Sequence, residues 1–274
     1  MDGILIIDKP YGMTSHDVVN WLRKRYKQKK FGHTGTLDPN ATGVLVVLCG
    51  KACKCLQFLS DTDKEYIGSI EFGISTSTDD IWGEIEEKKE VNLNFNFDEE
   101  LQKFIGKNHQ LVPRTSNKKI NGKKLMDYQR QGLEVPKVYS DIEIYEMENL
   151  GNYSFRVSCS SGTYVRSICR DLANNTHNLG CMKSLRRTKV GRFTIDQAQT
   201  LEELETQEPI LYPMIEVLDH LEKVNYEPIE EVYQGKRIQY TTSANQICIM
   251  DKNEPIAIYE KEKENIFKSK RGLW

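Results

Sequence analysis

The sequence predicts an α+β protein, because strand-like and helix-like segments both occur along its 274 residues. Residues 44–48 form an apolar, β-branched run of the length of a buried strand, and residues 64–72 alternate like a half-buried strand. Residues 15–26 instead place apolar side chains on one helical face and basic ones on the other. A chain of this length, 38% hydrophobic and 28% charged, can bury one sizeable core and a small second domain.

The other elements of the first half follow from turn and capping residues. Lys9-Pro10-Tyr11-Gly12 ends a strand over 3–8, and Thr14 or Ser15 caps the helix that runs to about Tyr26. Further along we expect a short helix over 51–59, a polar loop over 75–83, a mostly exposed acidic segment to about Phe97 and a helix over 98–105.

The second half begins with an irregular basic segment, residues 109–135, which is typical of a functional loop or of disorder. Asn149-Leu150-Gly151-Asn152 then predicts a hairpin between two alternating strands. The remaining expected elements are strands over 138–145 and 153–159, a helix from Tyr164 to about Asn175, a strand over 185–195, a helix and connector over 213–221, and strands over 246–250 and 255–259 within a β-rich segment, 225–274.

One carboxylate is held in a loop that glycine and proline restrict. The loop reads Gly32-His33-Thr34-Gly35-Thr36-Leu37-Asp38-Pro39-Asn40-Ala41-Thr42-Gly43. Pro39 biases Asp38 toward an extended conformation, and the buried strand that follows anchors the loop in the core. Local chemistry alone leaves two interpretations open, a catalytic carboxylate or an Asx-type turn.

This loop resembles the catalytic motif of the TruB family of tRNA pseudouridine synthases, and four further segments agree with that family in order and spacing. Five such segments in register make the resemblance specific, and it covers nearly the whole chain. It implies a mixed, largely antiparallel sheet flanked by helices, with a PUA-like β-domain at the C-terminus. The four segments are Gly3 to Pro10 with Gly12-Met13-Thr14-Ser15, Lys64-Glu65-Tyr66, Ser161-Gly162-Thr163-Tyr164-Val165-Arg166, and Leu185-Arg186-Arg187-Thr188.

The resemblance also implies an activity, the isomerisation of the T-loop uridine at position 55 of tRNA to pseudouridine. Asp38 is then the nucleophile, attacking either uracil C6 or ribose C1′. Arg166 is its charge-assisted partner, and Tyr66 stacks on the flipped uracil. The other substrate contacts implied are His33, Tyr164 and Leu185.

The resemblance further implies a catalytic domain over 1–222, with an RNA-binding insertion at about 107–136, and a PUA-like RNA-binding domain over 223–274. The formal net charge is -2, but basic residues are clustered, and clustered charge can bind phosphates on a neutral protein. We expect RNA contacts from Lys118, Lys119, Lys123, Lys124, Arg186 and Arg187. The insertion departs from the family pattern at Val112 to Lys118, so its individual contacts are not carried over.

Other features exclude several classes of protein. No segment has the length of a membrane span, and no signal peptide is visible, so we expect a cytoplasmic protein. Seven cysteines favour reduced thiols, and the spacing of Cys49, Cys53 and Cys55 matches no zinc pattern. We therefore expect no metal and no cofactor, tRNA through its T arm as the partner, no obligate protein partner, and a monomer.

Two other functions compete with this interpretation. A tRNA-binding chaperone or regulatory RNA-binding protein would keep the fold without turnover, and the set of Asp38, Tyr66 and Arg166 argues against it. A metal-dependent hydrolase built on Asp38 and the Asp79-Asp80 pair is the weaker alternative.

Overall fold

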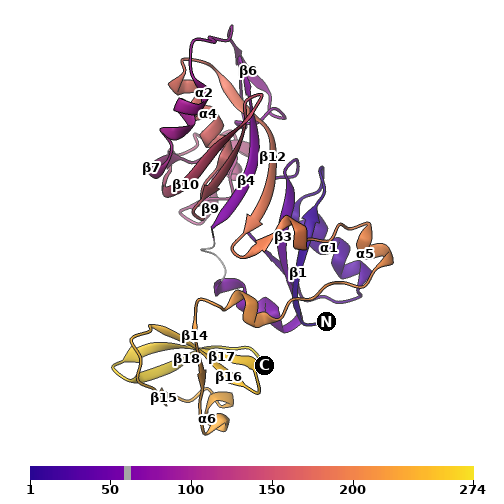
Figure 1. Ribbon diagram of the computed structural model, residues 1–274, viewed down its shortest axis with the longest axis vertical. Helices are drawn as coiled ribbons and strands as arrows, with labels where there is room; N and C mark the ends of the chain where they lie inside the picture. Colours follow the sequence, from indigo (N-terminus) through magenta and orange to yellow (C-terminus); the bar gives the residue numbers. More distant parts are fainter. Residues whose placement is uncertain (59–62) are drawn as a thin grey trace. The chain divides into compact units, whose positions relative to one another are not determined.

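A computed structural model describes residues 1–58 and 63–274, and these divide into two compact units (Figure 1). The first unit comprises Met1–Asp38, Leu45–Ser60 and Gln197–Trp274. The second comprises Pro39–Val44 and Asp61–Asp196. The chain therefore crosses between the units directly after Asp38.

The first unit is built on strands β1 (Gly3–Lys9), β2 (Phe31–Thr34) and most of β3 (Thr42–Cys49). Strand β2 pairs antiparallel with β3, and β1 is the other neighbour of β3. Helix α1 (Ser15–Arg25) covers these strands, and its buried Val18 and Leu22 join the apolar core.

The predicted start of this helix is confirmed. Thr14 is the N-cap, and its hydroxyl accepts from the backbone N–H of Asp17 while the Asp17 carboxylate accepts from that of Thr14. This reciprocal capping box satisfies amide groups that the helix itself leaves unpaired. The apolar face was also predicted correctly, since it faces the core.

Short elements complete this part of the first unit. The helix expected over 51–59 is the 3₁₀-helix η1 (Gly50–Phe58), and the expected residue 59 lies outside the described residues. Within the predicted helix and connector over 213–221, the helical part is the 3₁₀-helix η3 (Met214–Val217). The chain also forms η2 (Ile195–Gln197) and α5 (Glu203–Thr206), and the segment between them bonds back to β1.

The C-terminal residues form a five-stranded sheet of their own, as the strand patterns over 246–259 indicated. Its core contains Ile249, Tyr259 and Phe267, all fully buried. The strands follow the order β14 (Glu222–Asn225), β16 (Gln246–Asp251), β17 (Glu254–Lys263), β18 (Ile266–Gly272) and β15 (Ile238–Gln239), with the short helix α6 (Ile229–Tyr233) beside them.

The second unit contains a mixed, largely antiparallel sheet, which confirms the predicted fold class. Its antiparallel strands run in the order β12 (Gly180–Val190), β4 (Lys64–Phe72), β11 (Ser154–Cys159), β10 (Tyr139–Gly151) and β7 (Gly106–Leu111). Strand β13 (Phe193–Thr194) folds back onto β12. The first residues of β3 pair with β12 in parallel, through Thr42 with Arg186 and Gly43 with Arg187.

Helices α4 (Val165–Asn175) and α2 (Phe97–Gln102) pack on this sheet (Figure 1). α4 places Val165, Ile168 and Leu172 in the core, as its pattern predicted. The predicted hairpin is confirmed, since β10 and β11 pair antiparallel, but its turn lies at Asn152-Tyr153 because β10 continues to Gly151.

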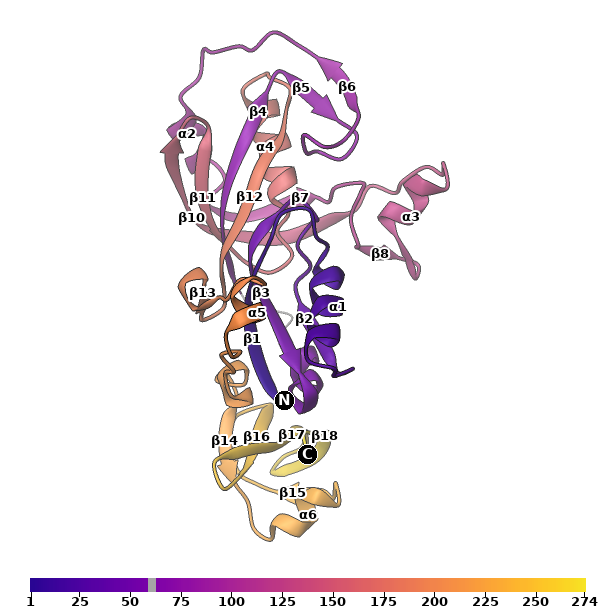
Figure 2. The same ribbon diagram turned by 90° about the vertical axis from the view of Figure 1, so that its right-hand side faces the viewer.

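Two predictions for this unit were incomplete. Within the expected polar loop and acidic segment, β5 (Ile74–Thr76) pairs with β6 (Ile85–Lys88), whose residues are all exposed. The segment 109–135 is not irregular throughout, because its first residues lie in β7. It also contains β8 (Lys119–Ile120), β9 (Lys123–Lys124) and α3 (Leu125–Arg130), and Figure 2 shows β8 and α3 projecting from the sheet. β7 pairs with the distant strand β10, which a local pattern does not reveal, whereas β5 with β6 and β8 with β9 form short local hairpins.

Gly43 lies where an added side chain would clash with the backbone of the neighbouring strand. Its φ is +102°, and an added Cβ would lie 2.1 Å from the carbonyl oxygen of Arg187. We predict that Gly43→Ala lowers the free energy of unfolding by at least about 2 kcal/mol. Gly151 has a φ of +85° with open space around it, so Gly151→Ala is the matched control and should cost about 1 kcal/mol. Urea denaturation of both variants checks this, and equal losses would contradict it.

Candidate active site

The loop that carries Asp38 is tied to the start of α1. Ser15, the first residue of that helix, is buried and bonds to Leu37 twice. Its hydroxyl accepts from the Leu37 amide at 2.9 Å and donates to the Leu37 carbonyl at 3.2 Å. Leu37 is itself buried, and Gly35 adopts a φ of +63° as the chain leaves β2. The residue directly before the candidate nucleophile is therefore fixed through both its backbone N–H and its carbonyl.

Asp38 itself is half-buried, and its backbone is followed by the exposed ring of Pro39. His33 is also half-buried and lies within β2, opposite Val47 of β3. The loop thus presents a carboxylate at an accessible position on a support that two hydrogen bonds and a proline hold in place.

Tyr66 lies in the middle of the second unit's sheet. It occupies β4, opposite Val157 of β11 and Arg187 of β12, and only 8% of it is exposed. The guanidinium of Arg187 hydrogen-bonds to the Tyr66 side chain. The ring is therefore fixed from the neighbouring strand rather than free to rotate outward.

Arg187 differs from the predicted phosphate contact, because it is only 1% exposed. Its Nε donates to the carbonyl oxygen of Val44 at 2.7 Å. Burial lowers the pKa of Arg187, and the contact with Tyr66 partly offsets that shift. An internal guanidinium held in this way supports the sheet and Tyr66, and its burial is inconsistent with a role on the RNA-binding surface.

The neighbours of Arg187 on β12 remain closer to the surface. Leu185 is half-buried and lies opposite Gly68 of β4. Arg186 is half-buried as well, and its Nη1 donates to the Thr42 hydroxyl at 3.3 Å.

Arg166 lies in the first turn of α4, where the sequence predicted it, but it is buried rather than solvated. Its Nη1 donates to the Thr78 carbonyl at 2.9 Å and to the Thr115 hydroxyl at 2.7 Å. Its Nη2 donates to the Thr115 carbonyl at 3.3 Å, and a carboxylate oxygen of Asp80 lies 3.9 Å from Nη1. These contacts hold the guanidinium in one orientation.

Tyr164, the residue before α4, is fixed through its backbone. Its amide donates to Oε1 of Gln110 at 2.8 Å, and its carbonyl accepts from Nε2 of the same side chain at 3.1 Å. Gln110 lies in β7 and is 5% exposed. Because one amide side chain satisfies both groups, the start of α4 is aligned with that strand.

Four of these supporting residues were not predicted as parts of the site. Thr78, Thr115 and Gln110 carry no local signal, since ordinary polar residues become informative only when a buried arginine or a helix start lies beside them. Asp80 was considered only with Asp79 as a metal ligand, and the structure instead places it beside Arg166.

The predicted lysines gather on one hairpin. β8 and β9 pair Lys119 with Lys124 and Ile120 with Lys123. Lys118 and Lys119 are exposed, and Lys123 lies 4.4 Å from the centre of the Tyr128 ring in a cation–π contact. The structure thus brings these four lysines together on one projecting element.

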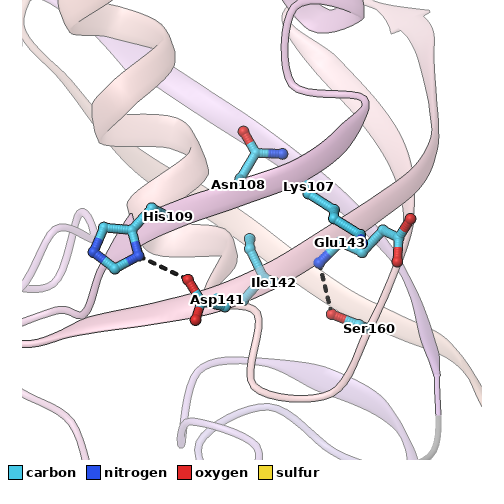
Figure 3. A pocket seen from close by; sticks show the side chains of 7 residues that line it. All are labelled: Lys107, Asn108, His109, Asp141, Ile142, Glu143 and Ser160. Carbon is cyan, nitrogen blue, oxygen red and sulfur yellow. Dashed lines mark hydrogen bonds and ion pairs between the residues drawn. The ribbon is translucent and has the colours of Figure 1, made fainter.

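A cavity of about 530 Å³ lies elsewhere, between β7 and β10, and Figure 3 shows the side chains that line it. His109 Nδ1 lies 2.8 Å from Asp141, and the ring stacks on Tyr139 with centroids 4.8 Å apart. The lining of the cavity contains none of the predicted site residues. It consists of Lys107, Asn108, His109, Asp141, Ile142, Glu143 and Ser160.

Two other kinds of feature are missing from residues 1–58 and 63–274. In that part of the chain no three or more His, Cys, Asp or Glu side chains gather as metal ligands would. Nor does any helix there combine the length and apolar character needed to cross a bilayer. The seven cysteines are free thiols, and burial raises the pKa of Cys49, Cys159, Cys181 and Cys248 to about 11.

Comparison with solved structures identifies the fold. The chain superposes on a protein from "Crystal Structure of a Cbf5-Nop10-Gar1 Complex" with a TM-score of 0.73 and 24% identity, covering 100% of this chain and 85% of that one. It matches "Structure of H/ACA RNP bound to a substrate RNA containing 2'-deoxyuridine" with the same TM-score, 23% identity, and coverage of 99% and 85%. At these identities the likeness shows a common fold.

Sequence comparison shows the family. Residues 23–165 match the N-terminal domain of TruB family pseudouridylate synthases, and residues 166–221 match a tRNA pseudouridylate synthase B C-terminal domain. A tRNA pseudouridine synthase B of Alkaliphilus oremlandii is 44% identical, with 87% of this chain and 83% of that protein covered. The Oceanobacillus iheyensis protein of the same name is 37% identical, with 97% and 94% covered.

Fold and sequence together define a pseudouridine synthase, an enzyme of the isomerase class. The chain belongs to the TruB family, as its motifs indicated.

The bond between Arg187 and Tyr66 yields a stability prediction. Arg187→Met and Tyr66→Phe should each destabilise the fold, and the double variant should lose about 1.5–3 kcal/mol less than the sum of the two, because both changes remove one charge-assisted hydrogen bond. Urea denaturation of the single and double variants measures this coupling. Combining Tyr66→Phe with Arg237→Met, whose guanidinium pairs with Glu262 in the C-terminal sheet, is the additive control. If the effects of Arg187→Met and Tyr66→Phe are additive, the hydrogen bond between these residues contributes nothing to the free energy of unfolding.

Proposed function

We propose that this enzyme converts the uridine at position 55 in the T loop of tRNA to pseudouridine, with Asp38 as the nucleophile. The observation that carries the proposal is the Asp38 loop. It matches the family motif, and the preceding residue is fixed by two hydrogen bonds to Ser15. The names of the relatives, tRNA pseudouridine synthase B, support tRNA as the substrate.

The reaction exchanges one bond of uracil for another. The glycosidic bond from N1 to C1′ breaks, the base turns, and a bond from C5 to C1′ forms. C5 loses a proton and N1 gains one, so atoms and charge balance without an oxidant or a reductant. A carboxylate suits the attack because it is ionised at neutral pH and is also a competent leaving group. The attack is directed at either uracil C6 or ribose C1′.

Arg166 has the role of orienting the nucleophile. Its contacts with Thr78, Thr115 and Asp80 hold the guanidinium at a fixed angle, so that its planar fork is aligned before substrate binds.

Tyr66 has the role of receiving the base. An aromatic ring held by Arg187 offers a fixed face on which the flipped uracil can stack, and its hydroxyl can assist removal of the C5 proton. Unstacking the uridine from its loop costs a few kcal/mol, which contacts to the RNA must offset. Tyr164, Leu185 and His33 are the remaining proposed contacts to the displaced base and its loop.

The rest of the RNA is bound by basic surfaces in this proposal. The hairpin with Lys118, Lys119, Lys123 and Lys124 contacts phosphates, since it concentrates positive charge on a projecting element. The β-domain from residue 223 onward is proposed as a second, PUA-like RNA-binding part, supported by its separate sheet and core. Such a substrate would place the enzyme in the cytoplasm.

We predict that Asp38→Asn abolishes isomerisation while RNA binding stays within about tenfold, because the amide keeps the shape but is not a nucleophile. Single-turnover assays on T-arm RNA in the presence of EDTA measure pseudouridine directly and also test for a metal-dependent hydrolase. Asp141→Asn is the matched control, since that carboxylate lines the separate cavity. A near-normal rate for Asp38→Asn would refute the nucleophile assignment.

Binding should also weaken with salt despite the net charge of -2. Replacing Lys118, Lys119, Lys123 and Lys124 by Gln should reduce the slope of log K against log salt by about 1 to 3, because fewer counterions are released from the RNA. Fluorescence anisotropy with labelled T-arm RNA provides the measurement. Substituting Lys88, Lys89 and Lys103 in the same unit is the control, and an identical change in both variants would place the phosphate contacts elsewhere.

A further inference from the structure

Helix α4 carries a second arginine on the face that holds Arg166. Arg170 follows four residues later, so the two guanidiniums lie one turn apart on the same side of the helix. They reach adjacent carboxylates on the segment 77–83. Arg170 Nη1 lies 3.0 Å from Oδ2 of Asp79, and Arg166 Nη1 lies 3.9 Å from Oδ2 of Asp80. Two successive turns of one helix thus hold two successive residues of this segment.

Arg170 also holds a second segment. Its Nη2 donates to the Leu111 carbonyl at 3.1 Å, and the Ser167 hydroxyl donates to the same oxygen at 2.7 Å. Leu111 ends β7, and Thr115, a partner of Arg166, lies four residues beyond it. The two arginines therefore fix both the segment that supplies Asp80 and the segment that supplies Thr115.

The conformation of Asp79 shows why such support is needed. Its φ is +60°, a left-handed angle that is uncommon in residues other than glycine and that contacts of this kind stabilise. Its carbonyl accepts from the Met182 amide at 3.0 Å, and the Met182 carbonyl accepts from Ile81 at 2.9 Å. The backbone of this segment is thus anchored to β12, while the Asp79 carboxylate is anchored to α4.

Arg170 is well placed to stay charged in this role. Both members of the pair are mostly buried, with 20% and 17% of their side chains exposed. Burial alone lowers the pKa of Arg170, but Asp171, 2.9 Å from its Nε, and Asp79 outweigh burial and raise it. All three nitrogens of the guanidinium have an acceptor among Asp171, Asp79 and Leu111.

We propose that Arg170 is a positioning residue for the isomerisation. By holding Asp79 and the Leu111 carbonyl, it fixes the two segments whose Asp80 and Thr115 orient Arg166. This inference rests on the proposed function, because it assigns Arg170 to the reaction through Arg166. This role requires no contact between Arg170 and the RNA.

The test compares four variants in single-turnover assays at saturating T-arm RNA. Arg170→Met should slow isomerisation about 30- to 100-fold, since misplacement of about 1 Å near a reacting group has effects of this size. Arg170→Lys should slow it at least tenfold, because an ammonium on a flexible stem cannot satisfy three acceptors in the same plane. Asp79→Asn should slow it about tenfold, and adding Asp79→Asn to Arg170→Met should slow it no further. The dissociation constant for RNA should stay within about threefold throughout.

Two controls separate positioning from general destabilisation. Arg156→Met removes an arginine paired with Glu148 in the same unit, and Met147→Ala destabilises the core of β10 away from both segments. Both should keep the parent rate. A rate loss in Met147→Ala comparable with that of Arg170→Met at similar thermal stability would overturn the proposal.

Hydrogen exchange provides a readout that does not depend on activity. Arg170→Met should speed exchange of the Ile81 and Val112 amides, whose acceptors are Met182 and Val138, while Arg156→Met should leave them unchanged. Faster exchange with an unchanged single-turnover rate, or unchanged exchange, would refute the positioning role. If the parent enzyme forms no pseudouridine in T-arm RNA, the proposed function fails, whereas the exchange comparison still decides whether Arg170 holds these segments.

Discussion

The pairing of the first residues of β3 with β12 is the constraint on which the second unit depends. Gly43 lies so close to the backbone of Arg187 that no side chain fits, and the Arg187 guanidinium bonds to the carbonyl of the next residue, Val44. The same guanidinium then bonds to Tyr66 on the other neighbouring strand. One buried arginine thus ties three strands together at the point where the chain leaves the Asp38 loop.

A buried arginine is expensive to desolvate, so its place at this junction calls for a reason. An apolar side chain of the same volume would remove both hydrogen bonds, and a hydrogen bond to a charged group contributes about 1.5–3 kcal/mol. Arg187 supplies both donors from one rigid fork. The cost of burying the charge is offset by a geometry that an apolar residue cannot reproduce.

The sequence predicted elements whose signals are local and failed where partners are distant. The α1 cap, strand β4 and the position of Arg166 in α4 follow from capping residues, alternation and motif spacing. Strand β7 is polar because it lies at the sheet edge, and its identity depends on pairing with β10. The same limit applies to the candidate site. The residues of the Asp38 loop could be predicted, but the bonds from Ser15 to Leu37 and from Arg166 to Thr115 join segments that only the fold brings together.

Helix α4 begins with the wrong charge for its own stability. No acidic residue lies in its first turn, no side chain caps its N-terminus, and Arg166 puts a cation beside the positive end of the helix macrodipole. A cation at this end disfavours a helix by about 0.3–1 kcal/mol, a cost that the Asp80 carboxylate beside Arg166 offsets in part. Replacing Arg166 with an acidic residue would therefore favour the helix macrodipole, but the new side chain would repel a carboxylate. The start of α4 is therefore less stable than helix rules would allow. A search for thermostable variants guided by those rules alone would select against the arginine that the family motif contains.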